Sequence, residues 1–111
     1  MESERKIILT GTAASQGVAR GKVKIVTGIR DASSFEEGSI LVTKITDPTM
    51  VMMMAKSAAI ICDIGGLTSH PSIVSREMGI PCVVNTKDAT SVLKDGQEVV
   101  VDGTAGKVYE A

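Results

Sequence analysis

The residues best suited to chemistry in this chain lie in one short Gly-Gly-Leu-Thr-Ser-His segment. Its last residue, His70, is the only histidine, and a neutral imidazole nitrogen is a competent nucleophile near pH 7. Thr68 and Ser69 supply hydroxyls that can cap a helix or donate to phosphate oxygens. Gly65 and Gly66 let the backbone approach a ligand without a Cβ in the way. The segment therefore indicates a nucleophile beside an anion-binding loop.

The elements on either side predict where this loop lies. Ala58–Cys62 is a continuous apolar run, which is typical of a strand buried on both faces. The spacing of apolar residues predicts a helix over Pro71–Met78, closed by Gly79 in a left-handed conformation. Pro81–Val84 predicts a second buried strand. The three elements form a βαβ unit with parallel strands, and His70 lies at the helix start, where the backbone N–H groups and helix dipole favour an anion.

The remaining segments predict an α/β domain with mixed sheets. Gly11, Gly17 and Gly21 indicate a loop in which backbone turns or passes close to another segment. Asp47 and Pro48 suit a helix start, and the methionines that follow indicate flexible core filler, with a partner surface as the alternative. The predicted strands are Ile7–Leu9, Val23–Val26 and Ile40–Thr43; the predicted helices are 49–56 and 88–93; and the predicted closing hairpin is 98–109.

Composition excludes several classes of function. Apolar residues make up 43% of the 111 residues but aromatic ones only 2%, which argues against stacking of single-stranded nucleic acid. The net charge of -1, without a basic stripe, excludes a surface for nucleic-acid phosphates. We expect no membrane span or signal peptide, because no apolar stretch is long enough and the N terminus is charged. Cys62 and Cys82 indicate buried thiols, with a disulfide or metal role as the less favoured interpretation.

From the residues alone, His70 has competing interpretations. A histidine near a helix start is often only a cap. A Ser-His-Asp hydrolase is disfavoured, because Ser69 and His70 are adjacent and no Gly-x-Ser-x-Gly elbow is present. A metal site is disfavoured by the single histidine and the absence of ligand spacing. No metal is therefore predicted for this chain.

The segment 65–84 closely resembles the GG-x-TSH-x-x-IVARE-x-GIP-x-VV signature of phosphoenolpyruvate-utilizing enzymes, which include pyruvate phosphate dikinase, phosphoenolpyruvate synthase and enzyme I. Residues 11–23 are similar to the GxxASPGxAxGxV segment of the same family. Thr46-Asp47-Pro48 is similar to the segment before the family's first helix, and residues 95–96 and 101–103 resemble its closing hairpin. The resemblance covers nearly the whole chain.

The resemblance implies a three-layer β/β/α swivelling domain, with the βαβ unit carrying the histidine loop. It implies that His70 is the phosphorylated residue and that Thr68 and Ser69 tune the imidazole and bind phosphate. Gly65 and Gly66 would shape the phosphate loop. Arg76 would pair with phosphate at a docked site, with a surface salt bridge to Glu77 or another acid as the alternative.

This chain departs from the family pattern at a few positions. Pro71 and Ser72 stand where small alanines are usual, and Ser75 replaces Ala in the IVARE stretch. Asn85 replaces Gly after the second buried strand, and Gln16 replaces Pro. None of these changes removes His70, although Pro71 can alter how the loop packs against a partner.

The resemblance also implies partners. In the family this module shuttles a phosphoryl group between an ATP-grasp nucleotide domain and a phosphoenolpyruvate/pyruvate barrel. Residues 1–111, predicted to be one domain, leave no room for either and contain no Walker-type loop. We expect one phosphocarrier chain of a split, cytoplasmic phosphotransferase. ATP or phosphoenolpyruvate, with Mg²⁺, would be bound by partner chains rather than by this one, and pyruvate or another small hydroxyl compound would be the acceptor.

Two other hypotheses stay open. The first is a non-catalytic regulatory or scaffolding subunit that keeps the fold, against which the intact Gly-Gly-x-Thr-Ser-His segment argues. The second is a domain excised from a longer protein, against which the N-terminal Met1 and the C-terminal residues argue.

Overall fold

The structure is a computed structural model that describes residues 5–111. At its centre lie three parallel strands. Strand β5 (Ala59–Cys62) pairs in parallel with β4 (Ile40–Thr43) on one side and with β6 (Cys82–Val84) on the other. Every residue of these three strands is buried. Burial on both faces explains why their sequences are continuous apolar runs rather than alternating ones.

Strand β3 (Val18–Ile25) joins this parallel sheet to a second, antiparallel one. Its first half pairs antiparallel with β7 (Glu98–Asp102), and its second half pairs in parallel with β4. Strand β2 (Thr12–Ser15) pairs antiparallel with the far side of β6. The complete strand order is β1 (Ile7–Thr10), β8 (Lys107–Glu110), β7, β3, β4, β5, β6 and β2.

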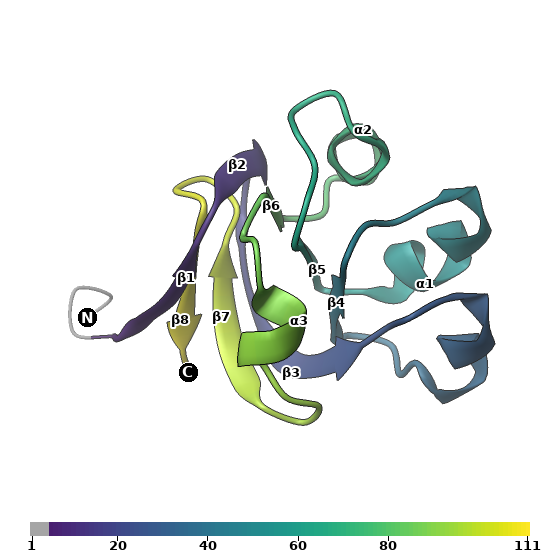
Figure 1. Cartoon of the computed structure of the whole chain (residues 1–111), viewed down its shortest axis with the longest axis horizontal. Helices are drawn as coiled ribbons and strands as arrows, with labels where there is room; N and C mark the ends of the chain where they lie inside the picture. Colours follow the sequence, from purple (N-terminus) through teal and green to yellow (C-terminus); the bar gives the residue numbers. More distant parts are fainter. Residues whose placement is uncertain (1–4) are drawn as a thin grey trace.

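The strands and helices form three layers. Figure 1 shows β1, β8 and β7 on one side, β4, β5 and β6 in the middle, and helices α1 (Val51–Lys56) and α2 (His70–Met78) on the other side. Helix α3 (Ala89–Val92) lies between the two sheets, and two 3-10 helices span Ile29–Ser34 and Pro48–Met50. This arrangement confirms the predicted β/β/α fold.

The buried apolar side chains fall into two clusters, one on each face of the parallel sheet. The cluster between the sheets includes Val23, Ile61 and Val101. The cluster between the parallel sheet and the helices includes Leu41, Ile60 and three methionines, Met50, Met53 and Met54. These methionines are the flexible core filler that the sequence indicated, whereas Met52 on the same helix is exposed.

The predicted βαβ unit is confirmed. Ile60 lies opposite Cys82 and Ile61 opposite Val83 in a parallel register, and α2 connects the two strands. Gly79 ends the helix with a φ of 70°, the left-handed conformation that glycine adopts without strain.

The predicted start of the first helical segment is also confirmed. The Asp47 carboxylate accepts a hydrogen bond from the Thr49 N–H at 2.8 Å, and Pro48 is the first helical residue. The closing hairpin is formed by β7 and β8 in antiparallel register. The last predicted helix is present as α3, which ends at Val92.

The prediction of a loop over the first glycines was wrong. Strands β2 and β3 occupy most of that segment, and Gly21 lies within β3. The other part of the prediction is confirmed, because the backbone at these glycines passes close to other segments. A Cβ on Gly21 would lie 2.8 Å from the Gly38 carbonyl oxygen, where β3 crosses from one sheet to the other. Such a contact is too short for any other residue, so the strand requires glycine there.

Both cysteines are buried and free, as the apolar runs around them indicated. Burial raises the pKa of the Cys62 thiol far above its ordinary value and raises the pKa of Cys82 to about 11. Both thiols are therefore protonated near neutral pH and are poor nucleophiles.

No helix in the part of the chain from residue 5 onward is long and apolar enough to cross a membrane. That residues 1–111 form a single domain stays a prediction, and residues 1–4 lie outside those that the structure describes.

Candidate functional site

The candidate site is the loop that leaves the carboxyl end of β5 and enters α2. Strand β5 ends at Cys62, and α2 begins at His70. Because β5 lies between two parallel neighbours, the segment between these residues is presented at the carboxyl edge of the sheet, where α/β folds tend to place ligands. Figure 1 shows the loop leaving β5 and turning into the start of α2.

The two glycines at the start of this loop have different roles. Gly65 has a φ of 124°, and a Cβ there would lie 2.9 Å from the Ser69 Oγ. A side chain at Gly66, in contrast, would meet no atom within 4 Å. The Gly66 carbonyl accepts hydrogen bonds from the Ser69 and Ser72 hydroxyls, each at 2.7 Å. Gly65 therefore fixes the turn, and Gly66 provides the carbonyl that ties the loop to the helix.

The loop hydroxyls do not act as helix caps. Ser69 occupies the N-cap position, but its side chain makes no capping hydrogen bond to the helix and donates to the Gly66 carbonyl instead. The predicted capping role of Ser69 is therefore wrong. Thr68 is exposed, and within residues 5–111 its hydroxyl makes no recorded hydrogen bond. Its predicted role on phosphate stays a prediction.

The His70 imidazole is held through one of its two nitrogens. Its Nδ1 lies 2.7 Å from Oγ1 of Thr46, a buried residue on the segment that follows β4. No hydrogen bond to Nε2 occurs among the described residues. The side chain is half-buried. Either tautomer keeps Nδ1 engaged with the hydroxyl, so Nε2 is the nitrogen left to meet a reactant.

Asp47 adds a negative charge next to this pair. Hydrogen bonds from the Thr49 hydroxyl and N–H lower the pKa of Asp47, and the charge of the nearby His70 lowers it further. The carboxylate is therefore ionised at neutral pH and lies close enough to the imidazole to interact with it electrostatically.

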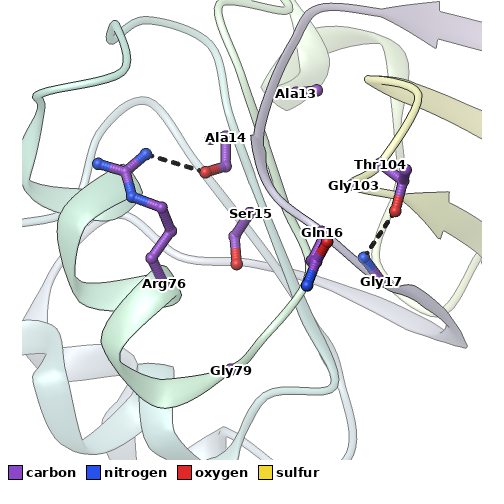
Figure 2. A pocket seen from close by; sticks show the side chains of 9 residues that line it. All are labelled: Ala13, Ala14, Ser15, Gln16, Gly17, Arg76, Gly79, Gly103 and Thr104. Carbon is purple, nitrogen blue, oxygen red and sulfur yellow. Dashed lines mark hydrogen bonds between the residues drawn. The ribbon is translucent and has the colours of Figure 1, made fainter.

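Arg76 lies two turns along α2 and reaches back to the loop. Its Nη2 donates to the Leu67 carbonyl at 2.6 Å. Its Nη1 donates to the Ala14 carbonyl at 3.0 Å, the bond drawn in Figure 2. Its guanidinium thus bridges α2, the histidine loop and β2. Among the described residues both of its hydrogen bonds go to backbone carbonyls rather than to Glu77 or another acid. Whether Arg76 also meets a phosphate stays a prediction.

A buried carboxylate anchors the first residue of the loop. Asp63 accepts hydrogen bonds from the Thr90 N–H at 3.0 Å and from the Thr90 hydroxyl at 2.5 Å. Its carbonyl accepts from the Lys87 N–H at 2.8 Å. Lys87 has a φ of 80°, which is uncommon for a residue with a side chain. The loop therefore begins from a fixed point between β5 and α3.

An open pocket of about 860 Å³ lies beside Arg76 and does not include His70. Figure 2 shows Arg76 on one side of it and Thr104, which accepts a hydrogen bond from the Gly17 N–H, on the other. Within residues 5–111 no three metal-ligating side chains come together. The candidate residues Thr68, Ser69 and His70 therefore lie on the loop, outside this pocket.

This arrangement suits transfer of an anionic group to Nε2. The His70 imidazole lies at the first turn of a nine-residue helix, where backbone N–H groups and the helix dipole stabilise negative charge. Sequence reasoning found His70 and its loop but missed Thr46 as part of the site. The Thr46-Asp47-Pro48 match to the family was the signal that could have identified it.

Solved structures with the same fold define the class of protein. The holo form of Thermococcus kodakaraensis aconitase X superposes with a TM-score of 0.68 at 22% identity, over 93% of this chain and 97% of that one. The solution structure of Enzyme I (nEIt) superposes with a TM-score of 0.59 at 35% identity, over 68% of this chain and 32% of that one. The first likeness concerns the fold alone. Together they define a swivelling α/β domain.

The sequence comparisons place the chain in a family. The model of the PEP-utilising enzyme mobile domain matches residues 35–106, and the chain belongs to this family. It is 56% identical over 109 residues to a probable phosphoenolpyruvate synthase of Archaeoglobus fulgidus, covering 98% of this chain and 14% of the relative. It is 51% identical over 107 residues to the phosphoenolpyruvate synthase of Pyrococcus furiosus, covering 96% and 13%.

The chain thus corresponds to only a small part of the curated relatives it matches. The shares of 14% and 13% mean that most of each relative lies outside the matched segment. The enzyme family is that of these synthases, and the resemblance to phosphoenolpyruvate-utilizing enzymes is confirmed.

Proposed function

We propose that this chain carries a phosphoryl group on Nε2 of His70, between a site that binds ATP and a site that binds phosphoenolpyruvate or pyruvate. The observation that carries this proposal is the 2.7 Å contact between His70 Nδ1 and Thr46 Oγ1. When Nδ1–H donates a hydrogen bond to the Thr46 hydroxyl, the free lone pair of the imidazole is on Nε2. That nitrogen is then the nucleophile.

The transfer step balances without a further reactant. The Nε2 lone pair attacks phosphorus, an N–P bond forms, and the bond between phosphorus and the bridging oxygen of the donor breaks with its electron pair leaving on that oxygen. In the second half, a base of the partner domain would take a methyl proton from pyruvate; the resulting enolate oxygen attacks phosphorus, and the electron pair of the N–P bond returns to Nε2. The start of α2 stabilises the phosphoryl dianion in between.

The nucleotide, phosphoenolpyruvate and Mg²⁺ would be held by the partner domains. The metal would neutralise charge on the transferring group when bound. The relatives carry several times more sequence than this chain, which covers 14% of the one from Archaeoglobus fulgidus. The partners are therefore either separate chains of a split enzyme or other domains of one polypeptide. Pyruvate as the acceptor and the cytoplasm as the location stay predictions.

A graft tests this proposal. The segment of the Archaeoglobus fulgidus relative that matches this chain is replaced by the 111 residues of this chain, and the chimera is incubated with phosphoenolpyruvate labelled with ³²P at phosphorus. We expect one acid-labile, base-stable phosphate per chain, absent from the His70→Ala chimera. A scaffolding subunit would acquire no label, and that outcome would overturn the proposal.

A further inference from the structure

Asp63, the first residue after β5, has every polar group of its backbone and side chain engaged. Its N–H donates to the Thr43 carbonyl at 3.1 Å, and its carbonyl accepts from the Lys87 N–H at 2.8 Å. Its carboxylate accepts from the Thr90 N–H at 3.0 Å and from the Thr90 hydroxyl at 2.5 Å. The residue is buried. The histidine loop therefore starts from a residue that is held on all sides.

The Asp63 carboxylate caps helix α3 from a distant part of the chain. Asp88 occupies the N-cap position of α3, but its side chain makes no capping hydrogen bond. The N–H of Thr90, the second residue of the helix, is instead satisfied by Asp63, 27 positions earlier. A cap that served only this four-residue helix could be supplied locally by Asp88. A cap supplied by Asp63 also ties the histidine loop to α3.

The segment that follows β6 closes over the same point. The Thr86 N–H and hydroxyl both donate to the last carbonyl of β5, at 3.2 and 2.9 Å. Asn85 and Lys87 have φ values of 58° and 80°, which residues with side chains seldom adopt. Such strain persists where the surrounding contacts over-determine the backbone, and it is concentrated at functional sites. We call residues 85–90 the clamp segment.

The same end of β5 also positions the residue that holds the imidazole. The N–H groups of residues 63 and 64 donate to the carbonyls of Thr43 and Lys44, each at 3.1 Å, which continues the pairing of β4 with β5 beyond their last residues. Thr46 follows two positions after Lys44, and its hydroxyl lies 2.7 Å from His70 Nδ1. The segment that carries Thr46 and the loop that carries His70 are therefore joined at residues 63 and 64.

We infer that Asp63 is a positioning residue for phosphoryl transfer to His70. Its carboxylate, held by α3 and the clamp segment, fixes the junction so that the Thr46 hydroxyl stays within hydrogen-bond distance of Nδ1. The bond from Nδ1–H then keeps the free lone pair on Nε2. The inference rests on the proposed function, in which Nε2 is the nucleophile. Among the described residues the carboxylate bonds Thr90 and not His70, so it acts on the ring through the backbone.

Loss of the carboxylate should loosen this junction. When the Thr46 hydroxyl no longer stays beside Nδ1, the ring exchanges between two tautomers, and only one of them has its lone pair on Nε2. Attack on phosphorus also requires an aligned nucleophile, so a small displacement of the ring slows transfer. A contact that only stabilised the fold would change the fraction of folded chain and leave the tautomer as it is.

The test compares variants of Asp63 with a matched control. Asp63→Ala removes both hydrogen bonds to Thr90. Asp63→Asn keeps the shape, with an amide oxygen for the Thr90 N–H and an amide N–H for the Thr90 hydroxyl. Thr90→Val removes the hydroxyl alone. Asp88→Ala is the control, because Asp88 lies at the start of the same helix, is exposed and makes no capping bond.

Two quantities are measured for each variant. The first is the rate of labelling from ³²P-phosphoenolpyruvate in the chimera described above. The second is the tautomer of His70, read from the ¹⁵N chemical shifts of the ring in the 111-residue chain, where it is the only histidine. The spectra are recorded at about pH 8.5, where imidazole is ordinarily neutral. Urea unfolding checks that each variant is folded under both conditions.

We expect Asp63→Ala to slow labelling by roughly tenfold and to replace the Nδ1–H tautomer with a mixture of the two. Thr90→Val should change both quantities in the same direction but by less. Asp63→Asn and Asp88→Ala should keep the Nδ1–H tautomer and label within about twofold of the unsubstituted rate.

Several results would overturn the inference. One is a less stable Asp63→Ala protein that labels at the unsubstituted rate, and another is slower labelling without a change of tautomer. Equal slowing in Asp63→Asn or Asp88→Ala would also contradict it. If Asp63→Ala does not fold, an unchanged rate and tautomer in Thr90→Val overturns the inference instead. An unsubstituted chimera that takes no label contradicts the proposed function, whereas the tautomer in the 111-residue chain tests the link from Asp63 to His70 separately.

Discussion

Thr46 Oγ1 and His70 Nδ1 lie 2.7 Å apart although 24 positions separate the two residues in sequence. Thr46 follows β4, and His70 begins the helix after β5; the parallel pairing of these strands brings the two side chains together at one edge of the sheet. The contact engages Nδ1 and leaves Nε2 as the nitrogen that we propose to react.

Replacing Thr46 with Val keeps the side-chain volume but removes the partner of Nδ1. We expect phosphoryl transfer to His70 to slow by about tenfold, because one hydrogen bond of roughly 1–2 kcal/mol no longer fixes the ring. The measurement is the rate of ³²P labelling. Thr86→Val is the matched control, since Thr86 is also buried and its hydroxyl bonds the Cys62 carbonyl instead. Equal slowing in both variants would contradict a specific role for Thr46.

Arg76→Ala removes two hydrogen bonds to backbone carbonyls. We expect the free energy of unfolding to fall by only about 1–2 kcal/mol, because solvent exposure of the guanidinium limits what its two hydrogen bonds contribute. We also expect faster amide exchange at residues 67–69. Urea unfolding and hydrogen exchange measure these effects, with Arg30→Ala, an exposed position on the 3-10 helix Ile29–Ser34, as the control. A variant with unchanged exchange and stability but slower transfer would favour the phosphate role instead.

Ser72 and Ser75 form a natural pair for a stability test. Both are fully buried on α2, but the Ser72 hydroxyl donates to the Gly66 carbonyl. The Ser75 Oγ has no partner of hydrogen-bond geometry and lies near only the Cys82 thiol, a weak hydrogen-bonding group. We expect Ser75→Ala to raise the free energy of unfolding by about 1 kcal/mol and Ser72→Ala to lower it by a similar amount. Denaturant unfolding measures both. A change of the same sign in the two variants would show that helix propensity outweighs the hydroxyl contacts.

The buried thiols predict a dependence of stability on pH. Burial raises the pKa of Cys82 to about 11, above the value for a thiol in the unfolded chain. The contribution of the protonated thiol is complete below the unfolded pKa and is lost as the pH rises through the folded value. We therefore expect the free energy of unfolding to fall between about pH 8.5 and 11, and to fall less in Cys82→Ala. An identical slope in both proteins would contradict this.

The sequence predicted the βαβ unit and the histidine loop because their signals are local. The apolar runs over β5 and β6 report burial on two faces, and Gly79 reports the left-handed end of α2. Strand β2 and the first part of β3 were missed because their glycines resembled a loop, whereas the predicted strand Val23–Val26 overlaps the end of β3. Gly21 is required because the Gly38 carbonyl and the Ile40 side chain lie close to it. A contact with a segment distant in the chain leaves no pattern in the local sequence.

The site was only partly predictable for a related reason. Arg76 donates to the carbonyls of Leu67 and Ala14, and a backbone carbonyl is the same whatever side chain it carries. No spacing rule could identify these acceptors. The sequence around Thr46 does not indicate a contact with His70, because only the pairing of β4 with β5 brings the two residues together.

The central claim is that His70 carries the phosphoryl group on Nε2, and nuclear magnetic resonance tests it most directly. The chimera is labelled with ¹⁵N-histidine and phosphorylated from phosphoenolpyruvate, and the spectrum identifies the nitrogen bonded to phosphorus. The account predicts one phosphorus coupled to Nε2 of His70 and none in His70→Ala. That variant should remain folded but lose roughly 1–3 kcal/mol of unfolding free energy, because the buried Thr46 hydroxyl loses its partner. Phosphorus on Nδ1, or a label that persists in His70→Ala, would contradict the account.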